Sequence, residues 1–421
     1  MTRLNPDGSY GWTRTFGGLG SDVSTGVGVD ADANVFVTGS FEFVVDFDPG
    51  PGIDMRLSNG GTDVFVVKLD ASGSKVSAYA VGGTEDDEGA DAAVDSWGDV
   101  VVTGHFRRKV DFDPTEGEDF RSSHGDRDIF ILKLGGDAAY DWAYTVGGLQ
   151  ADEGLAVAVD PDGNVCGTGR FRRIVDFDPG LTDDSHQANG GTDVFVTRLG
   201  PDGSYEGAQT FGGPSTDGAY DISVSSAGEL SVTGYFWDTV DFDPTEGVDE
   251  HTSAGQSDIF VTHLGPEGTY RWTQTMGGPL LEEGLAASVD ASGNTLVTGH
   301  FRGSVDFDPT QEVDEHTSVG GEDVFLLKLR SDGSYAWAVT VGGDGTDLGQ
   351  GIATDPHGRI MLTGSFSGLA DFDPSDGVEQ HASNGAADVF ILMLSCTSRW
   401  PYDTDSTYLI EPVDIHRIEH P

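Results

Sequence analysis

The chain has 421 residues, and its 72 acidic side chains outnumber its 22 basic ones to give a formal charge of −50, which argues against nucleic acid or an anionic membrane as a partner and favours cations. No apolar stretch is long enough to cross a bilayer, and the two cysteines, Cys166 and Cys396, are too few for a disulfide framework. The 62 glycines and 23 phenylalanines suit many short strands joined by tight turns, so we expect an all-β protein.

The chain opens with MTRLNPDGSY, which matches VTRLGPDGSY at 196–205 in the middle of a longer unit. We see no signal peptide before it, so we expect a fragment or a processed domain. The next landmark is VVDFDPG at 44–50, whose Asp-Phe-Asp-Pro core returns five more times. Its leading aspartates lie 65 residues apart without insertion or deletion: Asp46, Asp111, Asp176, Asp241, Asp306 and Asp371. A fixed period of this size predicts one array of repeats.

Each repeat reads as two β-hairpins with an insert between them. In the first repeat, residues 26–30 and 34–41 alternate between apolar and polar side chains, and residues 63–69 and 74–83 do the same. The insert at 42–62 explains why the repeat exceeds the roughly 40–50 residues of a common propeller blade. Small sheets of this kind bury both faces only by packing against their neighbours. We therefore predict a six-bladed β-propeller of four-stranded antiparallel blades.

The last repeat predicts how the propeller closes, because it supplies strands up to DVFILML at 388–394 but lacks a fourth. The segment SYGWTRTFGG at 9–18 stands one period before the missing strand. We expect N-/C-terminal strand exchange, in which 9–16 completes the last sheet and Met1–Leu4 is displaced. The alternative is a piece of a longer propeller. Residues 1–395 are thus assigned to the propeller, and 396–421 to a tail or the start of a further segment.

Three segments of the repeat, GGTDVFVVKLDASGS, AVGGTEDDEGADAAVD and GDVVVTGHF, resemble the SBBP-type β-propeller repeat of secreted and surface-attached bacterial proteins. The likeness covers nearly all of residues 1–394. The Asp-Phe-Asp-Pro motif looks like a variant insert of some family members. The resemblance implies an extracellular binding or scaffolding module with no defined reaction and no catalytic residues to transfer.

The paired aspartates of the insert are candidate calcium ligands. Both carboxylates of a pair leave the same side of an extended segment, while Phe47 points to the other side as an anchor. Asp-x-Asp followed by Gly, Thr or Ser begins like a calcium loop but lacks the closing glutamate. The alternative is that the carboxylates stabilise the turn ahead of Pro49. The twelve candidates are Asp46, Asp48, Asp111, Asp113, Asp176, Asp178, Asp241, Asp243, Asp306, Asp308, Asp371 and Asp373.

Four further aligned positions hold an acidic or a basic residue in all six repeats. A catalytic site is needed once, so acids that recur in every repeat are interpreted as structural. Asp63 and its counterparts are expected to accept backbone N–H groups of the preceding turn. In the insert, a basic residue follows an acid by two positions, and arginine replaces histidine there, which favours ion pairs over metal ligation. Another aligned position, outside the insert, is also always acidic: Asp22, Asp87, Asp152, Asp217, Glu282 and Asp347. The basic residues of the insert are Arg56, Arg121, His186, His251, His316 and His381.

Departures from the repeat are the places to look for individual function. HFRRK at 105–109 and RFRR at 170–173 put basic side chains on adjacent blades: Arg107, Arg108, Lys109, Arg170, Arg172 and Arg173. On so acidic a chain, this cluster is a candidate site for an acidic polymer such as a uronic-acid polysaccharide. The alternative is that the arginines balance neighbouring aspartates. Tyr140 and Trp142, one of four Tyr-x-Trp pairs, are expected to pack between blades, with a sugar-stacking strip as the alternative.

These features together indicate a non-enzymatic binding or scaffolding module, extracellular or at the cell surface, which we expect to be monomeric. The cofactor they suggest is structural Ca²⁺. The expected partner is an acidic polysaccharide or another surface protein, with neither nucleic acid nor membrane insertion. The alternative is a carbohydrate-active propeller that binds or cleaves glycans, and cleavage would need two acids about 5–10 Å apart in an open cleft.

Overall fold

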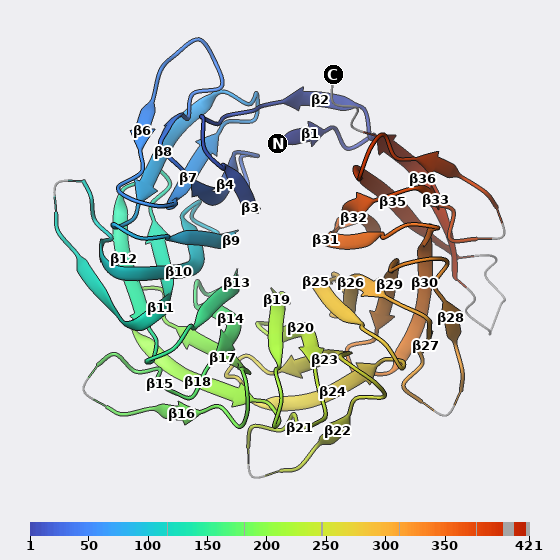
Figure 1. The fold of residues 1–421 in the computed structure, drawn as a ribbon. Coiled ribbons are helices and arrows are strands. Elements are labelled where there is room, and N and C mark those ends of the chain that lie inside the picture. The colour runs from blue at the N-terminus through green and yellow to red at the C-terminus, as the bar shows by residue number, and fades with distance from the viewer. Residues whose placement is uncertain are drawn as a thin grey trace. The chain divides into compact units, whose positions relative to one another are not determined.

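The computed structural model is all-β (Figure 1), and the chain folds as a six-bladed β-propeller of four-stranded antiparallel blades, as predicted. The structure describes residues 1–115, 117–180, 182–245, 247–310, 312–375, 377–398 and 408–417. Within these ranges the chain forms strands and no helix, so it contains no helix that could cross a membrane. The chain divides into two compact units, Met1–Gly212 and Gly213–Pro421.

The first unit holds a short N-terminal hairpin and blades 1, 2 and 3. The hairpin is β1 (Thr2–Leu4) and β2 (Tyr10–Thr13). Blade 1 is β3 (Val23–Val29), β4 (Val35–Phe41), β7 (Asp63–Leu69) and β8 (Lys75–Val81), with insert strands β5 (Val44–Asp46) and β6 (Met55–Leu57). Blade 2 is β9 (Glu88–Val94), β10 (Val100–Asp111), β11 (Phe120–Leu134) and β12 (Tyr140–Val146). Blade 3 is β13 (Glu153–Val159), β14 (Val165–Phe171), β17 (Asp193–Leu199) and β18 (Tyr205–Phe211), with β15 (Ile174–Asp176) and β16 (Ser185–Gln187).

The second unit holds blades 4, 5 and 6. Blade 4 is β19 (Gly218–Val224), β20 (Leu230–Phe236), β23 (Asp258–Leu264) and β24 (Tyr270–Met276), with β21 (Thr239–Asp241) and β22 (Glu250–Thr252). Blade 5 is β25 (Glu283–Val289), β26 (Thr295–Phe301), β29 (Asp323–Leu329) and β30 (Tyr335–Gly343), with β27 (Ser304–Asp306) and β28 (Glu315–Thr317). Blade 6 is β31 (Leu348–Thr354), β32 (Arg359–Phe366), β35 (Asp388–Ser398) and β36 (Tyr408–Arg417), with β33 (Leu369–Asp371) and β34 (Gln380–Ala382).

Each blade follows the two-hairpin pattern predicted from the alternation of apolar and polar residues. In blade 1 the order β3-β4-β7-β8 is antiparallel throughout, with Val35 opposite Leu69 and Lys68 opposite Ser77. The insert holds one feature that the pattern did not predict, a third small hairpin. In blade 2 this hairpin is continuous with the sheet, because β10 and β11 run through into it. Three-residue strands are too short to show a recognisable alternation.

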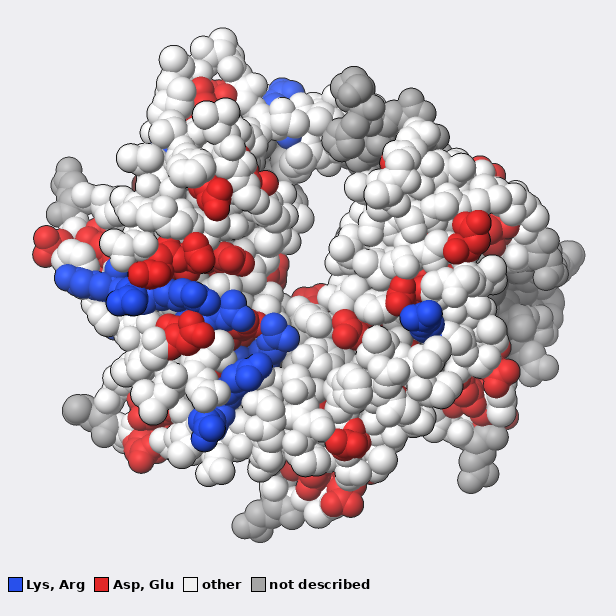
Figure 2. Space-filling view, viewed as in Figure 1, with Lys and Arg blue, Asp and Glu red and all other residues white. Residues whose placement is uncertain are grey.

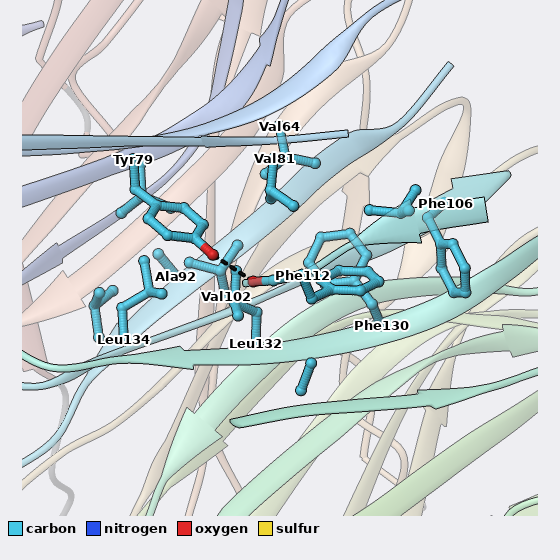
Figure 3. Close-up of a cluster of buried hydrophobic side chains, with 14 of the residues drawn as sticks. Val64, Tyr79, Val81, Ala92, Val102, Phe106, Phe112, Phe130, Leu132 and Leu134 are labelled. Carbon is cyan, nitrogen blue, oxygen red and sulfur yellow. Dashed lines mark hydrogen bonds between the residues drawn. The ribbon is translucent and has the colours of Figure 1, made fainter. Parts of the chain in front are cut away.

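Within each unit, the hydrophobic core lies between consecutive blades. In the cluster between blades 1 and 2, Val64 and Tyr79 pack against Val102, Phe112 and Leu132 (Figure 3). The Tyr79 hydroxyl donates a hydrogen bond to the backbone carbonyl of Phe112. Neighbouring blades therefore bury each other's faces, as the size of a single sheet requires.

The phenylalanine of Asp-Phe-Asp-Pro is the anchor that the sequence predicts. Phe112 is 1% exposed, and its ring meets Phe106 at 5.3 Å in an edge-to-face arrangement. Full burial of such a ring stabilises the fold by about 1.5–3 kcal/mol. Its counterparts are equally buried: Phe47, Phe177, Phe242, Phe307 and Phe372.

The N-terminal hairpin corrects the predicted strand exchange. β2 pairs with β1, so Met1–Leu4 is not displaced, and 9–16 does not pair with 388–394. Trp12 of β2 still makes a contact typical of a fourth strand, because its indole N–H donates to the carbonyl of Ala71 in blade 1 at 3.2 Å. β1 and β2 thus correspond to the last two strands of a blade, and they dock on blade 1 as a half blade.

Blade 6 takes its fourth strand from the C-terminal side instead. β36 pairs antiparallel with β35, with Phe390 opposite Arg417 and Ser398 opposite Tyr408. Residues 408–417, predicted to lie in a tail or further segment, therefore complete this sheet. Both observed pairings join strands that are close in sequence, whereas the exchange would join strands at opposite ends of the chain at a larger entropic cost.

A buried carboxylate fastens consecutive blades together, and we call this contact the clasp. At the seam between blades 2 and 3, Asp152 accepts the N–H of Gly148 at 2.7 Å and the N–H of Arg172 at 2.8 Å. Gly148 follows the last strand of blade 2, and Arg172 follows the second strand of blade 3. A Cβ on Gly148 would lie 2.5 Å from the carbonyl oxygen of Ile174, so only glycine fits. The equivalent glycine N–H is bound by Asp22, Asp87, Asp217, Glu282 and Asp347.

Asp63 caps the preceding turn, as predicted. Its Oδ2 accepts the N–H of Asn59 at 3.0 Å, while its buried Oδ1 accepts no hydrogen bond from any described residue. Burial raises the pKa of Asp63 to about 6. Burial, and to a lesser degree the charge of Asp63, raises the pKa of Asp87 to about 7. The same cap forms at Asp128, Asp193, Asp258, Asp323 and Asp388.

The raised pKa values predict that the protein is more stable in mild acid. A carboxyl whose pKa is higher in the folded state binds protons more tightly there than in the unfolded chain, where its pKa is about 4. The stability that this carboxyl contributes is fully present below the unfolded pKa of about 4, and it is lost as the pH rises through the folded pKa. Burial also raises the pKa of Asp152, Glu282 and Asp323 to about 7. We therefore expect a higher Tm at pH 5 than at pH 8.

Replacing Asp63 with asparagine tests this account in one blade. The amide oxygen keeps the cap on Asn59 and removes a buried charge, so we expect Tm at pH 8 to rise by about 2–4 °C and the difference between pH 5 and pH 8 to shrink. The control is Asp70→Asn, because hydrogen bonds, chiefly from Ser72, lower the pKa of this aspartate. It should leave the difference unchanged. Equal Tm values of wild type at the two pH values would contradict the account.

Candidate functional site

The Asp-Phe-Asp-Pro carboxylates hold the insert loop in every blade. In blade 1, Oδ1 of Asp46 accepts the N–H groups of Asp48 at 3.0 Å and Asp54 at 2.8 Å. Oδ1 of Asp48 accepts the N–H of Gly50 at 2.8 Å. These bonds are the turn-stabilising role that the sequence left open beside calcium binding. The bonds to Oδ1 recur at Asp111, Asp176, Asp241, Asp306 and Asp371.

The acid and base two residues apart in the insert form the predicted ion pairs. Nε of Arg121 lies 2.8 Å from Oδ1 of Asp119, and the hydroxyl of Tyr140 donates to the same carboxylate. In blades 3 to 6 a histidine takes the place of the arginine, with N–O distances of 3.1–3.4 Å. The described residues contain no group of three or more His, Cys, Asp or Glu side chains that could hold a metal ion.

The Tyr-x-Trp pairs contact neighbouring parts of the protein rather than forming a free strip. Nε1 of Trp142 donates to the carbonyl of Pro201 on the next blade at 3.1 Å, and its ring lies over the left-handed turn at Gly203. Trp272 makes the same bond to Ser331. These contacts favour packing between blades over sugar stacking. Cys166 is fully buried, as expected for a small core residue.

The basic residues of blade 2 line a cleft of about 500 Å³ beside its insert hairpin. Arg107 pairs with Asp126 at 3.3 Å, and Arg108 pairs with Glu85 at 2.9 Å, although its side chain is 73% exposed. The Lys109 ammonium lies 3.6 Å from the centre of the Phe120 ring. Ser122, Ser123, His124 and Gly125 complete the wall. The cleft thus combines cations, hydroxyl groups and the carboxylates of Glu85 and Asp126.

A buried glutamate connects this cleft to blade 3. Oε2 of Glu153 accepts from Arg170 at 2.6 Å, and its Oε1 is paired with Arg127. His105 lies within the influence of these charges, where burial and then Arg127 lower its pKa to about 4, so it is neutral at pH 7. One glutamate therefore holds two arginines from adjacent blades, and the group carries a net positive charge.

Arg172 and Arg173 continue the positive surface on blade 3. Both side chains are exposed, and neither forms an ion pair with any residue that the structure describes. Arg173, like Arg108 at the same position of blade 2, has a left-handed backbone with φ of 56°, a position where blades 5 and 6 use glycine. We call the whole group the arginine track: Arg107, Arg108, Lys109, Arg127, Arg170, Arg172 and Arg173.

Figure 2 shows basic side chains gathered in a continuous band over blades 2 and 3 of the first unit, bordered by acidic residues. The structure thus brings together all six basic residues predicted from sequence. Three of these residues, Arg107, Arg108 and Arg170, also form ion pairs with nearby acids, which agrees in part with the alternative that the arginines balance neighbouring acids. Sequence reasoning missed Arg127. An alignment of the repeats could have identified it, because the same position holds Thr, Thr, Ser, Glu and Ala in the other blades and a basic residue in blade 2 alone.

Calcium binding at the paired aspartates stays a prediction. In blade 1, Oδ2 of Asp46 accepts no hydrogen bond from the described residues, so it is free to bind a cation that also reduces repulsion from Asp48. We expect millimolar Ca²⁺ to raise Tm relative to chelator at fixed ionic strength, and Mg²⁺ to raise it less because it keeps its waters.

The variant that tests the site carries Asp46→Asn and Asp48→Asn in one blade. It should lose about one sixth of the calcium-dependent shift in Tm, because five of the six pairs remain. Identical melting curves of the wild type in Ca²⁺ and in chelator would show that the pairs only stabilise turns.

No protein-family model matches the chain. Two curated relatives are similar in sequence: the uncharacterized WD repeat-containing protein L264 of Acanthamoeba polyphaga mimivirus, 24% identical over 58% of this chain, and the regulatory protein FlaEY of Caulobacter vibrioides, 27% identical over 47% of it. The chain spans about 20% of the length of each relative. Among solved structures, Sqt1 from Chaetomium thermophilum matches 88% of this chain and 85% of its own, with 11% identity and a TM-score of 0.34.

Proposed function

We propose that the protein is a non-enzymatic binding module that takes an acidic polysaccharide on the arginine track. The observation that carries this proposal is a basic cleft of about 500 Å³ in a chain of charge −50. An acidic surface repels anions, so a local basic band is where an anionic chain can bind. The WD-repeat name of one relative and the regulatory name of the other are compatible with a binding or scaffolding role.

The ion pairs of the cleft do not prevent binding. Arg108 is 73% exposed and its partner Glu85 is 43% exposed, and such exposed pairs contribute only about 0–1 kcal/mol. A carboxylate of the ligand can therefore replace Glu85 at little cost. Arg172 and Arg173 need no such exchange. A polymer that engages both blades gains affinity from several weak contacts at once.

The chemistry of the ligand follows from charge density. Double-stranded DNA carries a charge about every 1.7 Å, and a chain of −50 repels it strongly outside the track. A uronic-acid polysaccharide carries one carboxylate per sugar, and its hydroxyl groups suit Ser122 and Ser123 in the cleft wall. The proposal includes an extracellular or cell-surface location and a monomeric protein. Another acidic surface protein is the second candidate partner.

Binding to immobilised polygalacturonate, with a neutral polysaccharide as reference, tests the proposal. The variant carries Arg107→Ser, Arg108→Gly, Arg172→Ser and Arg173→Gly, which are the residues that blade 6 uses at these positions, Ser367 and Gly368. We expect the wild type to be retained at low salt and released as salt rises, and the variant to be lost in the flow-through without a change in Tm.

The matched control is Arg302→Ser, because Arg302 occupies the position of Arg107 in blade 5, outside the track, and lies 3.9 Å from Glu322. It should be retained like the wild type. Equal retention of the fourfold variant would reject the arginine track as the binding site. Release of reducing sugars by the wild type would instead favour the carbohydrate-active alternative.

A further inference from the structure

The insert hairpin of blade 1 exposes several apolar side chains close together. Phe43 is 58% exposed, Val44 48%, Met55 59% and Leu57 65%. Val44 and Leu57 face each other across β5 and β6, and Leu57 and Met55 lie on the same side of β6. Leu19 is 99% exposed. It lies next to this hairpin, because it follows Gly18, which contacts the backbone carbonyl of Val44. We call β5, β6 and these side chains the apolar hairpin.

In each of the other blades, at least one of the two positions equivalent to Met55 and Leu57 holds a polar or charged side chain. The pairs are Phe120 and Ser122, Ser185 and Gln187, Glu250 and Thr252, Glu315 and Thr317, and Gln380 and Ala382. Charged and polar residues on an edge strand are a common way to prevent it from pairing with another chain. Blade 1 is the blade in which both positions hold large apolar residues.

The backbone of β6 presents an open edge. The N–H of Phe47 donates to the carbonyl of Asp54 at 3.1 Å, and the N–H of Ser58 donates to the carbonyl of Phe43 at 2.8 Å. In an antiparallel pair these bonds alternate, so Met55 and Leu57 direct their N–H and C=O groups away from β5. Neither residue forms a backbone hydrogen bond with any other described residue across that edge. Figure 1 shows β6 on the outside of blade 1.

We propose that β6 docks an extended segment of a partner protein, which adds a strand to the apolar hairpin. The partner carries apolar side chains at alternate positions, to cover Met55 and Leu57, and lysine or arginine at its flanks. The flanking charge follows from complementarity. Arg56, the basic residue of β6, is paired with Asp54 at 2.9 Å, whereas Glu42 and Asp48 beside the hairpin form no ion pair with described residues.

A second copy of the chain fits this edge less well. Each copy has a formal charge of −50, so two copies repel each other, while a basic segment is attracted. The proposal concerns blade 1 and is independent of the polysaccharide proposed for the arginine track.

The probe for this edge is a fluorescein-labelled peptide, KKVTVTVTKK, whose binding is followed by fluorescence anisotropy. We expect saturable binding to the wild type, and at least a tenfold loss of affinity in the variant Met55→Glu with Leu57→Thr. These residues are the ones that blade 4 uses, Glu250 and Thr252, so the variant should fold with an unchanged Tm. The control Glu315→Gln with Thr317→Ser, at the same positions of blade 5, should bind like the wild type.

Two altered peptides separate the components of recognition. KKVTPTVTKK lacks one backbone N–H, and EEVTVTVTEE reverses the flanking charge, and both should bind at least tenfold more weakly. The proposal is overturned if the wild type does not bind KKVTVTVTKK, or if the Met55→Glu, Leu57→Thr variant binds it equally well. It is also overturned if sedimentation equilibrium shows a wild-type dimer that this variant dissociates, because the occupant is then a second copy.

Discussion

The clasp is the interaction on which the rest of this structure depends. A four-stranded sheet cannot bury both faces alone, so each blade must be held against its neighbour in one register. Asp152 does this with two backbone hydrogen bonds, one to the end of blade 2 and one to blade 3. The side chain is fully buried, and each of these hydrogen bonds contributes about 0.5–1.5 kcal/mol. The glycine pair recurs because a side chain on Gly147 would clash with the Asp128 carboxylate, and one on Gly148 with the Ile174 carbonyl.

The clasp also explains where individual function can arise. It binds the backbone of Arg172 and leaves the guanidinium free, so this position accepts Glu, Arg, Trp or Ser in different blades without altering the seam. Asp152 and Glu153 are adjacent, and they join the same two blades in different ways. The first holds backbone, whereas the second holds the arginines of the track. A repeated scaffold contact therefore positions side chains that differ from blade to blade.

Much of this architecture could be predicted, because it follows from local patterns. The 65-residue period indicated six blades, strand alternation located the two main hairpins, and glycine before Asp63 indicated a turn cap. The fourth strand of blade 6 could not be predicted, because 408–417 has no counterpart in the period. The choice between β2 and β36 for the edge of β35 depends on competition between pairings, and no single segment reveals it.

The candidate site was predicted in part for the same reason. Runs such as HFRRK stand out in sequence, whereas Arg127 is a single change at one aligned position. Its role appears only when the fold places it on Glu153 beside Arg170. The apolar hairpin was missed because its strands are three residues long, and because exposure of Met55 and Leu57 is a property of the folded edge.

Hydrogen–deuterium exchange of the native protein tests the clasp most directly, by comparing Asp152→Ala with the wild type. The account predicts faster exchange at the amides of Gly148 and Arg172, since both lose their acceptor, and unchanged exchange at Gly83 and Arg107, which Asp87 binds. Unchanged exchange at Gly148 and Arg172 would contradict it, because the seam would then be held by apolar packing alone.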